Sequence, residues 1–332
     1  MIDLTVVWAG IIGFAIVAYV VMDGFDLGIG ILFPLFKVGR DRDTAMNSIA
    51  PVWDGNETWL VLGGGGLLAA FPLAYAIILP ALYAPLIAML LGLVLRGVAF
   101  EFRWRDPAHR PLWDVAFTLG SFIATFAQGV ALGALLQGIT VTGRSYGGGW
   151  WEWLSPFSLL TGAGLVVGYA LLGACWLNWK TEGGLQNQVV GYAGKLGIAL
   201  LVMIGLIGLA TLTLEAQYQT RWLSYPGILA TAQVPLATLI VTALFYRALK
   251  LRKDFQPFLW ALGLFGLCLL GLGVSIWPNV IPARVSIWAA AAPHRSQVFM
   301  LVGASVLVPV ILAYTAWAYW VFRGKVGEDG YH

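Results

Sequence analysis

The chain is poor in charge. Of its 332 residues only 11% are Asp, Glu, Lys or Arg, whereas 60% are hydrophobic. Soluble domains carry about 25% charge, and a soluble fold of this length cannot hide so much apolar surface. These proportions exclude a soluble enzyme and a disordered regulator. A β-barrel is not expected, because its strands alternate polar and apolar residues, whereas this chain is apolar for about 20 residues at a time.

Cysteine and histidine are also scarce. Cys175 and Cys268 lie in apolar stretches without a CxxC pair, so no disulfide framework is indicated. The histidines, His109, His294 and His332, all lie outside the apolar stretches. A membrane haem normally takes an axial His, Met or Cys from a helix facing the bundle interior. We therefore predict no directly bound haem or metal. The net charge of +3 is too small and scattered to indicate a nucleic-acid partner.

Nine apolar stretches are close to or above the length that a helix needs to cross a bilayer. Because lipid cannot satisfy a free backbone, the sequence predicts an all-α, polytopic membrane protein. We expect one transmembrane domain over 1–332, with four-helix bundles at 1–138 and 156–277 and a peripheral ninth helix at 298–322. The predicted spans are 4–36, 55–73, 76–100, 113–138, 156–179, 189–215, 226–247, 257–277 and 298–322.

Basic residues predict the orientation of these spans, because cytoplasmic loops are rich in Lys and Arg. One side carries Lys37, Arg40, Arg42, Arg103, Arg105, Arg110, Lys180, Arg247, Lys250, Arg252, Lys253, Arg323 and Lys325. The other side carries only Arg144, Arg221, Arg284 and Arg295. The first side is therefore predicted to be cytoplasmic. Nine spans then place the N-terminus outside and the C-terminus inside.

Four acidic residues in or beside the first two spans are the main candidates for function, because ionisable groups are costly within a membrane. Asp23 and Asp26 are three residues apart and share one face of a helix. The charge-free stretch before them would rise about 28 Å, which places the pair toward the cytoplasmic side. Asp54 and Glu57 open the second span at a similar depth. We predict that the four carboxylates converge and relay cytoplasmic protons into the membrane.

Structural roles for the same residues remain open. Asp54 and Glu57 also fit a capping box, which starts a helix and performs no chemistry. The first acidic pair could lie at the interface and bind Arg40 or Arg42. Arg96, at the end of the third predicted span, is expected to snorkel or to form an ion pair with the acidic cluster.

Several ordered motifs resemble one known family over nearly the whole chain. Asp23–Gly28 (DGFDLG), Trp53–Trp59 (WDGNETW) and Arg96–Arg103 (RGVAFEFR) are similar to hallmark segments of subunit II of bd-type quinol oxidases. The closing spans agree with this resemblance at Ser275–Pro282, Ser286–Ala292, Phe299–Gly303 and Tyr314–Gly324. The modest length resembles the compact, cyanide-insensitive branch.

The resemblance implies a haem-free subunit II in a bacterial plasma (inner) membrane. Its partner, subunit I, would carry haems b and d, oxidise quinol and reduce O2. Subunit II would brace that partner and help to conduct cytoplasmic protons to the oxygen site. Asp54 matches the family's proton-path Asp, Asp23 and Asp26 match its acidic pair, and Trp53 matches an adjacent Trp. Glu57 stands where Gln occurs in other members.

The resemblance leaves other partners open. In some members of the family a quinone also binds subunit II, but the sequence does not locate such a site. A small single-helix accessory subunit, quinol and membrane lipids are further expected partners.

Two other functions are compatible with the composition. A proton-coupled secondary transporter would have broken helices in matched halves and a site at mid-membrane, whereas these acids lie off centre. A purely structural scaffold would use the acids only as caps and interfacial ion pairs.

Overall fold

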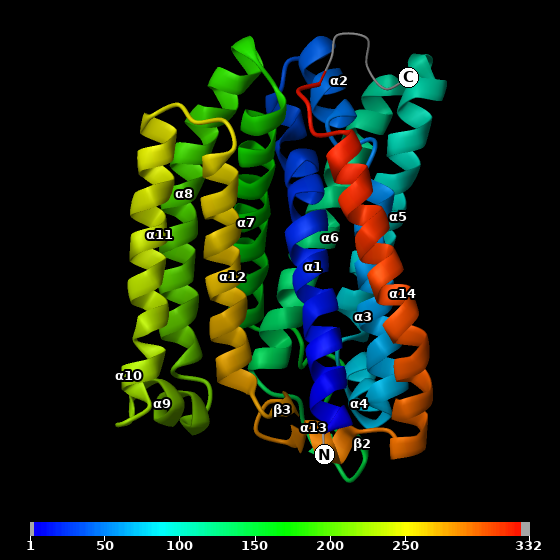
Figure 1. The fold of residues 1–332 in the computed structure, drawn as a ribbon, viewed down its shortest axis with the longest axis vertical. Coiled ribbons are helices and arrows are strands. Elements are labelled where there is room, and N and C mark those ends of the chain that lie inside the picture. The colour runs from blue at the N-terminus through cyan, green and yellow to red at the C-terminus, as the bar shows by residue number, and fades with distance from the viewer. Residues whose placement is uncertain (1–2, 327–332) are drawn as a thin grey trace.

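A computed structural model describes residues 3–326, and nearly all of the ordered structure is helical (Figure 1). Among these residues, eight helical segments are long and apolar enough to cross a membrane. The all-α, multi-pass class is therefore confirmed. The segments contain α1 (Leu4–Leu32) with the 3-10 turn η1 (Phe33–Leu35), α5 (Tyr83–Arg105), the 3-10 turn η2 (Pro107–His109) with α6 (Arg110–Leu136), α7 (Pro156–Lys180), α8 (Gly183–Thr211), α10 (Ile228–Thr231) with α11 (Gln233–Lys250), α12 (Gln256–Ile276) and α14 (His294–Val321).

The chain between α1 and α5 departs from the predicted spans. It forms α3 (Trp53–Ala70) and then a separate short helix, α4 (Pro72–Ala81). Phe71 leaves the helical region at φ −130° and ψ 60°, because the proline after it disfavours a helical conformation. The third predicted span, 76–100, therefore began too early, since the long helix starts at Tyr83. The 18-residue α3 is not among the eight apolar segments, because its first two turns contain polar residues.

The short elements gather at the two ends of the molecule. The α2 end carries α2 (Arg40–Asn47) and the end of α14 (Figure 1). The N-terminal end carries α4 and the remaining short elements. These are α9 (Ala216–Leu223), α13 (Ile287–Ala290) and two antiparallel hairpins, β1 (Val141–Thr142) with β2 (Ser145–Tyr146), and β3 (Asn279–Ile281) with β4 (Val285–Ser286).

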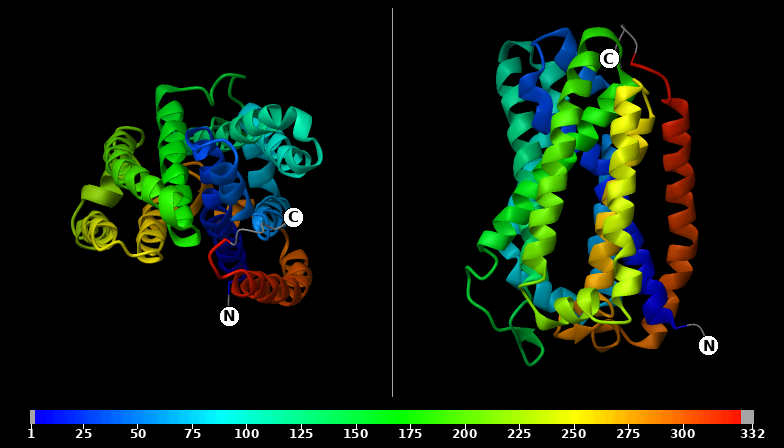
Figure 2. Two further views of the ribbon diagram at one scale, coloured as in Figure 1. Left: turned by 90° about the horizontal axis from the view of Figure 1, so that it is seen from above. Right: turned by 90° about the vertical axis from the view of Figure 1, so that its left-hand side faces the viewer.

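Helix α1 runs through the centre of the molecule. Helices α8 and α11 lie on one side of it, and α3, α5 and α14 lie on the other (Figures 1 and 2). The crossing of α1 with α7 requires glycine, because a Cβ at Gly28 would lie 1.8 Å from the Tyr169 carbonyl oxygen. Gly173 faces the same crossing, and a Cβ there would lie 2.5 Å from the Gly28 carbonyl carbon. Small residues thus let these backbones approach closely.

Helix α14 packs differently from the central helices. Gln297 is its one buried residue in the described chain. The Gln297 amide donates to the Ala292 carbonyl at 2.8 Å, and Trp8 donates to the Gln297 carbonyl at 3.1 Å. The Trp8 bond fastens the start of α14 to α1, and the far end of α14 lies beside the first turns of α3.

Candidate functional site

The first acidic pair lies deep in the molecule. Asp23 and Asp26 are both fully buried, one turn apart on α1. Both side chains are directed toward α3 and α5, since their polar partners come from those two helices. The i, i+3 spacing in the sequence therefore predicted their common face correctly.

Arg96 of α5 is the cation of this site, and its side chain is only 1% exposed. It donates from Nη1 to Asp23 Oδ1 at 2.7 Å and from Nη2 to Glu57 Oε1. Its guanidinium lies 5.9 Å from the ring centre of Trp53, which stacks on Phe100. The expected ion pair between Arg96 and the acidic cluster is thus confirmed. The alternative, an interfacial acidic pair bound to Arg40 or Arg42, is wrong, because both acids are fully buried and bind Arg96 and Asn56.

Asn56 joins the second carboxylate to α3 and α14, and sequence reasoning missed it. Its Nδ2 donates to Asp26 Oδ2 at 2.7 Å and to the Met22 carbonyl at 3.3 Å. Its Oδ1 accepts a hydrogen bond from the Tyr319 hydroxyl at 2.9 Å. The only sequence signal was its place between Asp54 and Glu57. We call Asp23, Asp26, Glu57, Arg96 and Asn56 the buried acid cluster.

Asp54 does not join this cluster by a hydrogen bond or ion pair in the described chain. It is exposed in the first turn of α3 and lines a cavity of about 120 Å³ that also reaches Asn56 and Tyr319. The other lining residues are Ala50, Pro51, Val52, Gly55, Tyr314, Thr315 and Ala318. The capping-box interpretation is wrong, because Val52 is the N-cap of α3 and no side chain caps it. The predicted convergence of four carboxylates therefore holds for three of them.

The buried acid cluster has more carboxyl groups than cations. Its one guanidinium binds two of the three carboxyl groups, and Asp23 Oδ2 and Asp26 Oδ1 are buried without a hydrogen-bond partner among the described residues. Buried polar atoms are normally paired, and exceptions often mark functional sites. This surplus of acceptors is suited to holding protons.

A second group of charges lies at the α2 end, and we call it the arginine network. Arg103 of α5 lies 2.5 Å from Asp114 of α6 and 2.9 Å from Asp43 of α2. Arg42 also binds Asp114, at 2.8 Å, and Arg110 also binds Asp43, at 2.9 Å. Each acid thus has two cations, and the network ties α2 to α5 and α6.

The histidines do not fit a buried haem. His109 lies in the exposed η2 turn, where its Nδ1 is 2.9 Å from Asp106 Oδ2. Hydrogen bonds from His109 and Trp113 hold the pKa of Asp106 below its usual 3.8. His294 is the exposed first residue of α14, and His332 lies outside the described residues. Within residues 3–326, no three His, Cys, Asp or Glu residues gather as a metal site.

Comparison with known proteins decides the family. The family model of cytochrome bd terminal oxidase subunit II matches residues 4–322. The chain belongs to this family. It is 29% identical to cytochrome bd-I ubiquinol oxidase subunit 2 of Escherichia coli K12, over 97% of this chain and 95% of that protein. It is also 29% identical to cytochrome bd ubiquinol oxidase subunit 2 of Bacillus subtilis, over 97% and 96%.

A solved structure has the same fold. The structure of bd oxidase from Geobacillus thermodenitrificans matches with a TM-score of 0.75 at 15% identity, over 98% of this chain and all of that one. The resemblance seen in the motifs is therefore confirmed. The protein is a multi-pass membrane subunit of a bacterial respiratory quinol oxidase, and subunit II implies a partner subunit I. None of these matches is a transporter, so that alternative gains no support.

Proposed function

We propose that this subunit conducts protons from the α2 end to the oxygen-reducing site of its partner. Reduction of O2 to water consumes protons. If they come from the cytoplasm while quinol releases its protons outside, the reaction builds a proton gradient. The residues that carry the route are Asp54 at its entrance and Asp26, Asp23 and Glu57 within the buried acid cluster, with Trp53 beside it.

One observation carries this proposal, namely the cavity beside Asp54. Its wall includes Asn56 and Tyr319, which are hydrogen-bonded to one another. Asn56 in turn donates to Asp26. Polar groups thus line the way from an exposed carboxylate toward a fully buried one, and the Asn56 amide positions the buried carboxylate without itself carrying the proton. A cavity with polar walls and a volume of about 120 Å³ has room for water, which would complete the proton relay.

Arg96 has a positioning role in this route. Its two terminal nitrogens bind Asp23 and Glu57, whereas Asp26 accepts a hydrogen bond from Asn56 instead. Like charges interact strongly in a low-dielectric interior, so a proton bound by the acid surplus lowers the repulsion among the carboxylates. The cluster can therefore take up a proton and pass it on while keeping its geometry.

The orientation follows from the charges at the two ends. We propose that the α2 end is cytoplasmic, because the basic residues gather there, and that the N-terminus lies outside in a bacterial inner membrane. Helix α3 would be the ninth crossing, since its 18 residues rise about 27 Å. Its polar first turns then lie at the cytoplasmic side. The crossings before and after residue 150 would form the two four-helix bundles, with α14 peripheral.

The redox groups belong to the partner in this proposal. The described histidines do not fit a buried haem, so haems b and d and the reacting oxygen are assigned to subunit I. This chain would brace that subunit and deliver protons to it. A quinone on this chain and a single-helix accessory subunit remain expectations from the family resemblance.

The test is the oxygen consumption of the purified two-subunit complex with quinol as the donor. Asp54→Asn should lower turnover severalfold, because an amide cannot carry a proton at the entrance. Asp26→Asn should lower it further while the haem absorption spectrum stays unchanged. Asp26→Glu keeps the carboxyl group and should restore much of the rate if the Asn variant fails to assemble.

Asp41→Asn is the matched control, because Asp41 lies at the same end of the molecule but does not line the cavity. It should turn over at the normal rate. Normal oxygen consumption with intact haem spectra in Asp54→Asn and Asp26→Asn would contradict the proton route. That result would instead favour a purely structural scaffold.

A further inference from the structure

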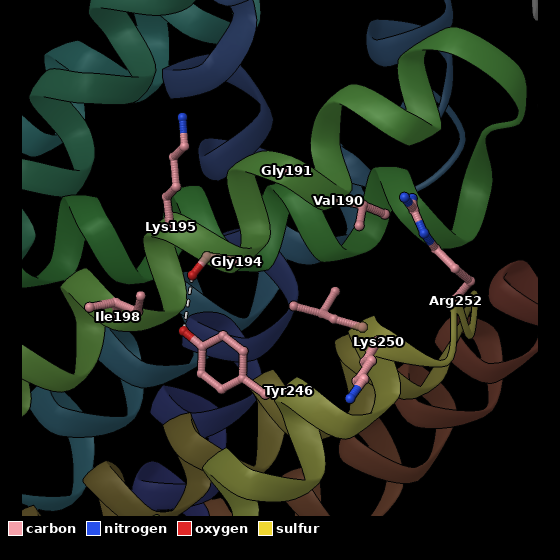
Figure 3. Close-up of a pocket in the computed structure, with 9 residues that line it drawn as sticks. Val190, Gly191, Gly194, Lys195, Ile198, Tyr246, Lys250 and Arg252 are labelled. Atoms are coloured by element: carbon pink, nitrogen blue, oxygen red, sulfur yellow. Dashed lines mark hydrogen bonds between the residues drawn. The ribbon is translucent and has the colours of Figure 1, made fainter.

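A pocket between α8 and α11 is not used by the proposed proton route. It has a volume of about 460 Å³ and lies on the opposite side of α1 from α3, α5 and α14 (Figures 1 and 3). The Tyr246 hydroxyl closes one end by donating to the Gly194 carbonyl at 2.9 Å. Gly191 and Gly194 line the pocket, so the α8 backbone itself forms part of its wall. A Cβ at either position would meet no atom within 4 Å.

Three cations line this pocket. Lys195 comes from α8, Lys250 ends α11 and Arg252 follows in the next turn. Figure 3 shows the Arg252 guanidinium reaching toward Val190, whereas the amines of Lys195 and Lys250 extend from the two helices in opposite directions. No carboxylate of the described chain pairs with any of them, and the Arg252 guanidinium donates to the Asn187 side chain, at 3.2 Å. The pocket therefore carries a local excess of positive charge on three exposed side chains.

An apolar stripe continues from the pocket along α8. Ile198, Val202 and Leu206 are spaced four residues apart, so they share one helix face. All three are largely exposed, at 60%, 55% and 49%. The stripe runs from the cations toward the middle of the membrane-spanning length. Cations above an exposed apolar stripe match a phosphate headgroup above its acyl chains.

We propose that the pocket binds an anionic phospholipid, with its headgroup phosphate beside Arg252, the exposed and flexible side chains of Lys195 and Lys250 turning toward it, and an acyl chain lying along the α8 stripe. Basic pockets between membrane helices are suited to such headgroups. Lys195 lies three turns into α8, where a charged side chain is costly unless it reaches an interface or an anion. A phosphate in the pocket satisfies this charge.

The test uses the purified two-subunit oxidase in phosphatidylcholine nanodiscs that contain a photoactivatable phosphatidylglycerol. After irradiation, labelled peptides are mapped by mass spectrometry. We expect label on α8 and α11 beside the pocket. Unlabelled phosphatidylglycerol should displace it, whereas phosphatidylcholine or inorganic phosphate at the same excess should not.

Two variants separate the charge of the pocket from its shape. The triple variant Lys195→Gln, Lys250→Gln, Arg252→Gln should lower labelling there on the order of tenfold, since each cation near an anionic lipid favours binding severalfold. Gly191→Leu keeps every charge but fills the pocket, and it should also lower labelling. The control Lys37→Gln, Arg247→Gln, Lys253→Gln removes three exposed cations that do not line the pocket, and labelling should persist.

Three results would overturn the proposal. The first is label spread evenly over the membrane surface of the complex, or absent from α8 and α11. The second is equal loss in the triple variant and its control, which would reflect general attraction to a basic end. The third is displacement by inorganic phosphate, which would show an anion site with no role for the lipid.

Discussion

The buried acid cluster and the arginine network are both built from Arg and carboxylates, yet their charge ratios are opposite. The buried acid cluster has three carboxyl groups for one guanidinium, and two of its buried carboxylate oxygens have no hydrogen-bond partner within residues 3–326. The arginine network has three guanidinium groups for two carboxylates, and each carboxylate binds two of them. The buried acid cluster has unpaired carboxylate oxygens that can accept protons, whereas each carboxylate of the arginine network is already bound by two cations.

If the proposed proton route is correct, the arginine network has a structural role and the buried acid cluster carries protons. A network in which each anion has two cations gains little from a further proton, so its task is to fix α2 on α5 and α6. A cluster with surplus carboxyl groups is held by a single arginine. Substitutions in the two groups should therefore have different effects on stability and on turnover.

The largest effect is expected from Arg96→Gln. It leaves Asp23 and Glu57 without the cation that binds them, and breaking a buried ion pair costs about 3–5 kcal/mol. The two-subunit complex should form in low yield with a clearly lowered melting temperature. Arg96→Lys keeps the charge and should recover part of both. An unchanged yield and melting temperature in Arg96→Gln would contradict the central role of this arginine.

A smaller loss of stability, with no loss of turnover, is expected from Arg103→Gln. Asp114 keeps Arg42 and Asp43 keeps Arg110, so no carboxylate is left unpaired. The lost charged hydrogen bond costs about 1.5–3 kcal/mol. The melting temperature should fall, while oxygen consumption per haem stays normal. A fall in turnover per haem would remove the distinction between the two groups.

Tyr319→Phe should lower turnover with little change in stability, the opposite of Arg103→Gln. It removes the hydroxyl that α14 donates to Asn56, at a cost of about 1 kcal/mol, so the melting temperature should change little. Turnover should fall a few-fold, with an altered pH profile, because the polar wall of the cavity is interrupted. Tyr314→Phe is the matched control, since Tyr314 lines the same cavity and is 67% exposed. Equal rates in the two variants would argue against the route along α14.

The smallest effect is expected at the exposed turn beside the arginine network. The pKa of Asp106 is lowered from 3.8, mainly by the hydrogen bond with His109, so its ionised form stabilises the folded state. That contribution is present above about pH 4 and is lost as the pH falls through the lowered pKa. Melting temperatures of the wild type and Asp106→Asn should differ slightly near about pH 6 and converge in acid. A difference that grows in acid would contradict this sign.

The sequence predicted most of the long helices, because an apolar run of this length leaves a membrane chain no other structure. It failed between α3 and α5, where breaks at Phe71 and Leu82 set off a separate short helix. It also grouped the acids by sequence spacing alone. Spacing places residues on a helix face but does not say what packs against that face. The hydrogen bond between Asn56 and Tyr319 carried no signal for this reason, since the two residues are 263 positions apart and meet only where α14 approaches α3.

The amino-acid sequence by itself determined the class of the protein, the family and the acids worth testing. Composition reflects the membrane that surrounds the chain, and local motifs contain the residues that carry the chemistry. Tertiary packing decided which of those acids meet. It placed Asp23 and Glu57 on one arginine, joined Asp26 to α14 through Asn56 and left Asp54 at the surface. The physical reason is that a buried charge must find a partner, and helices distant along the chain supply that partner only when they fold together.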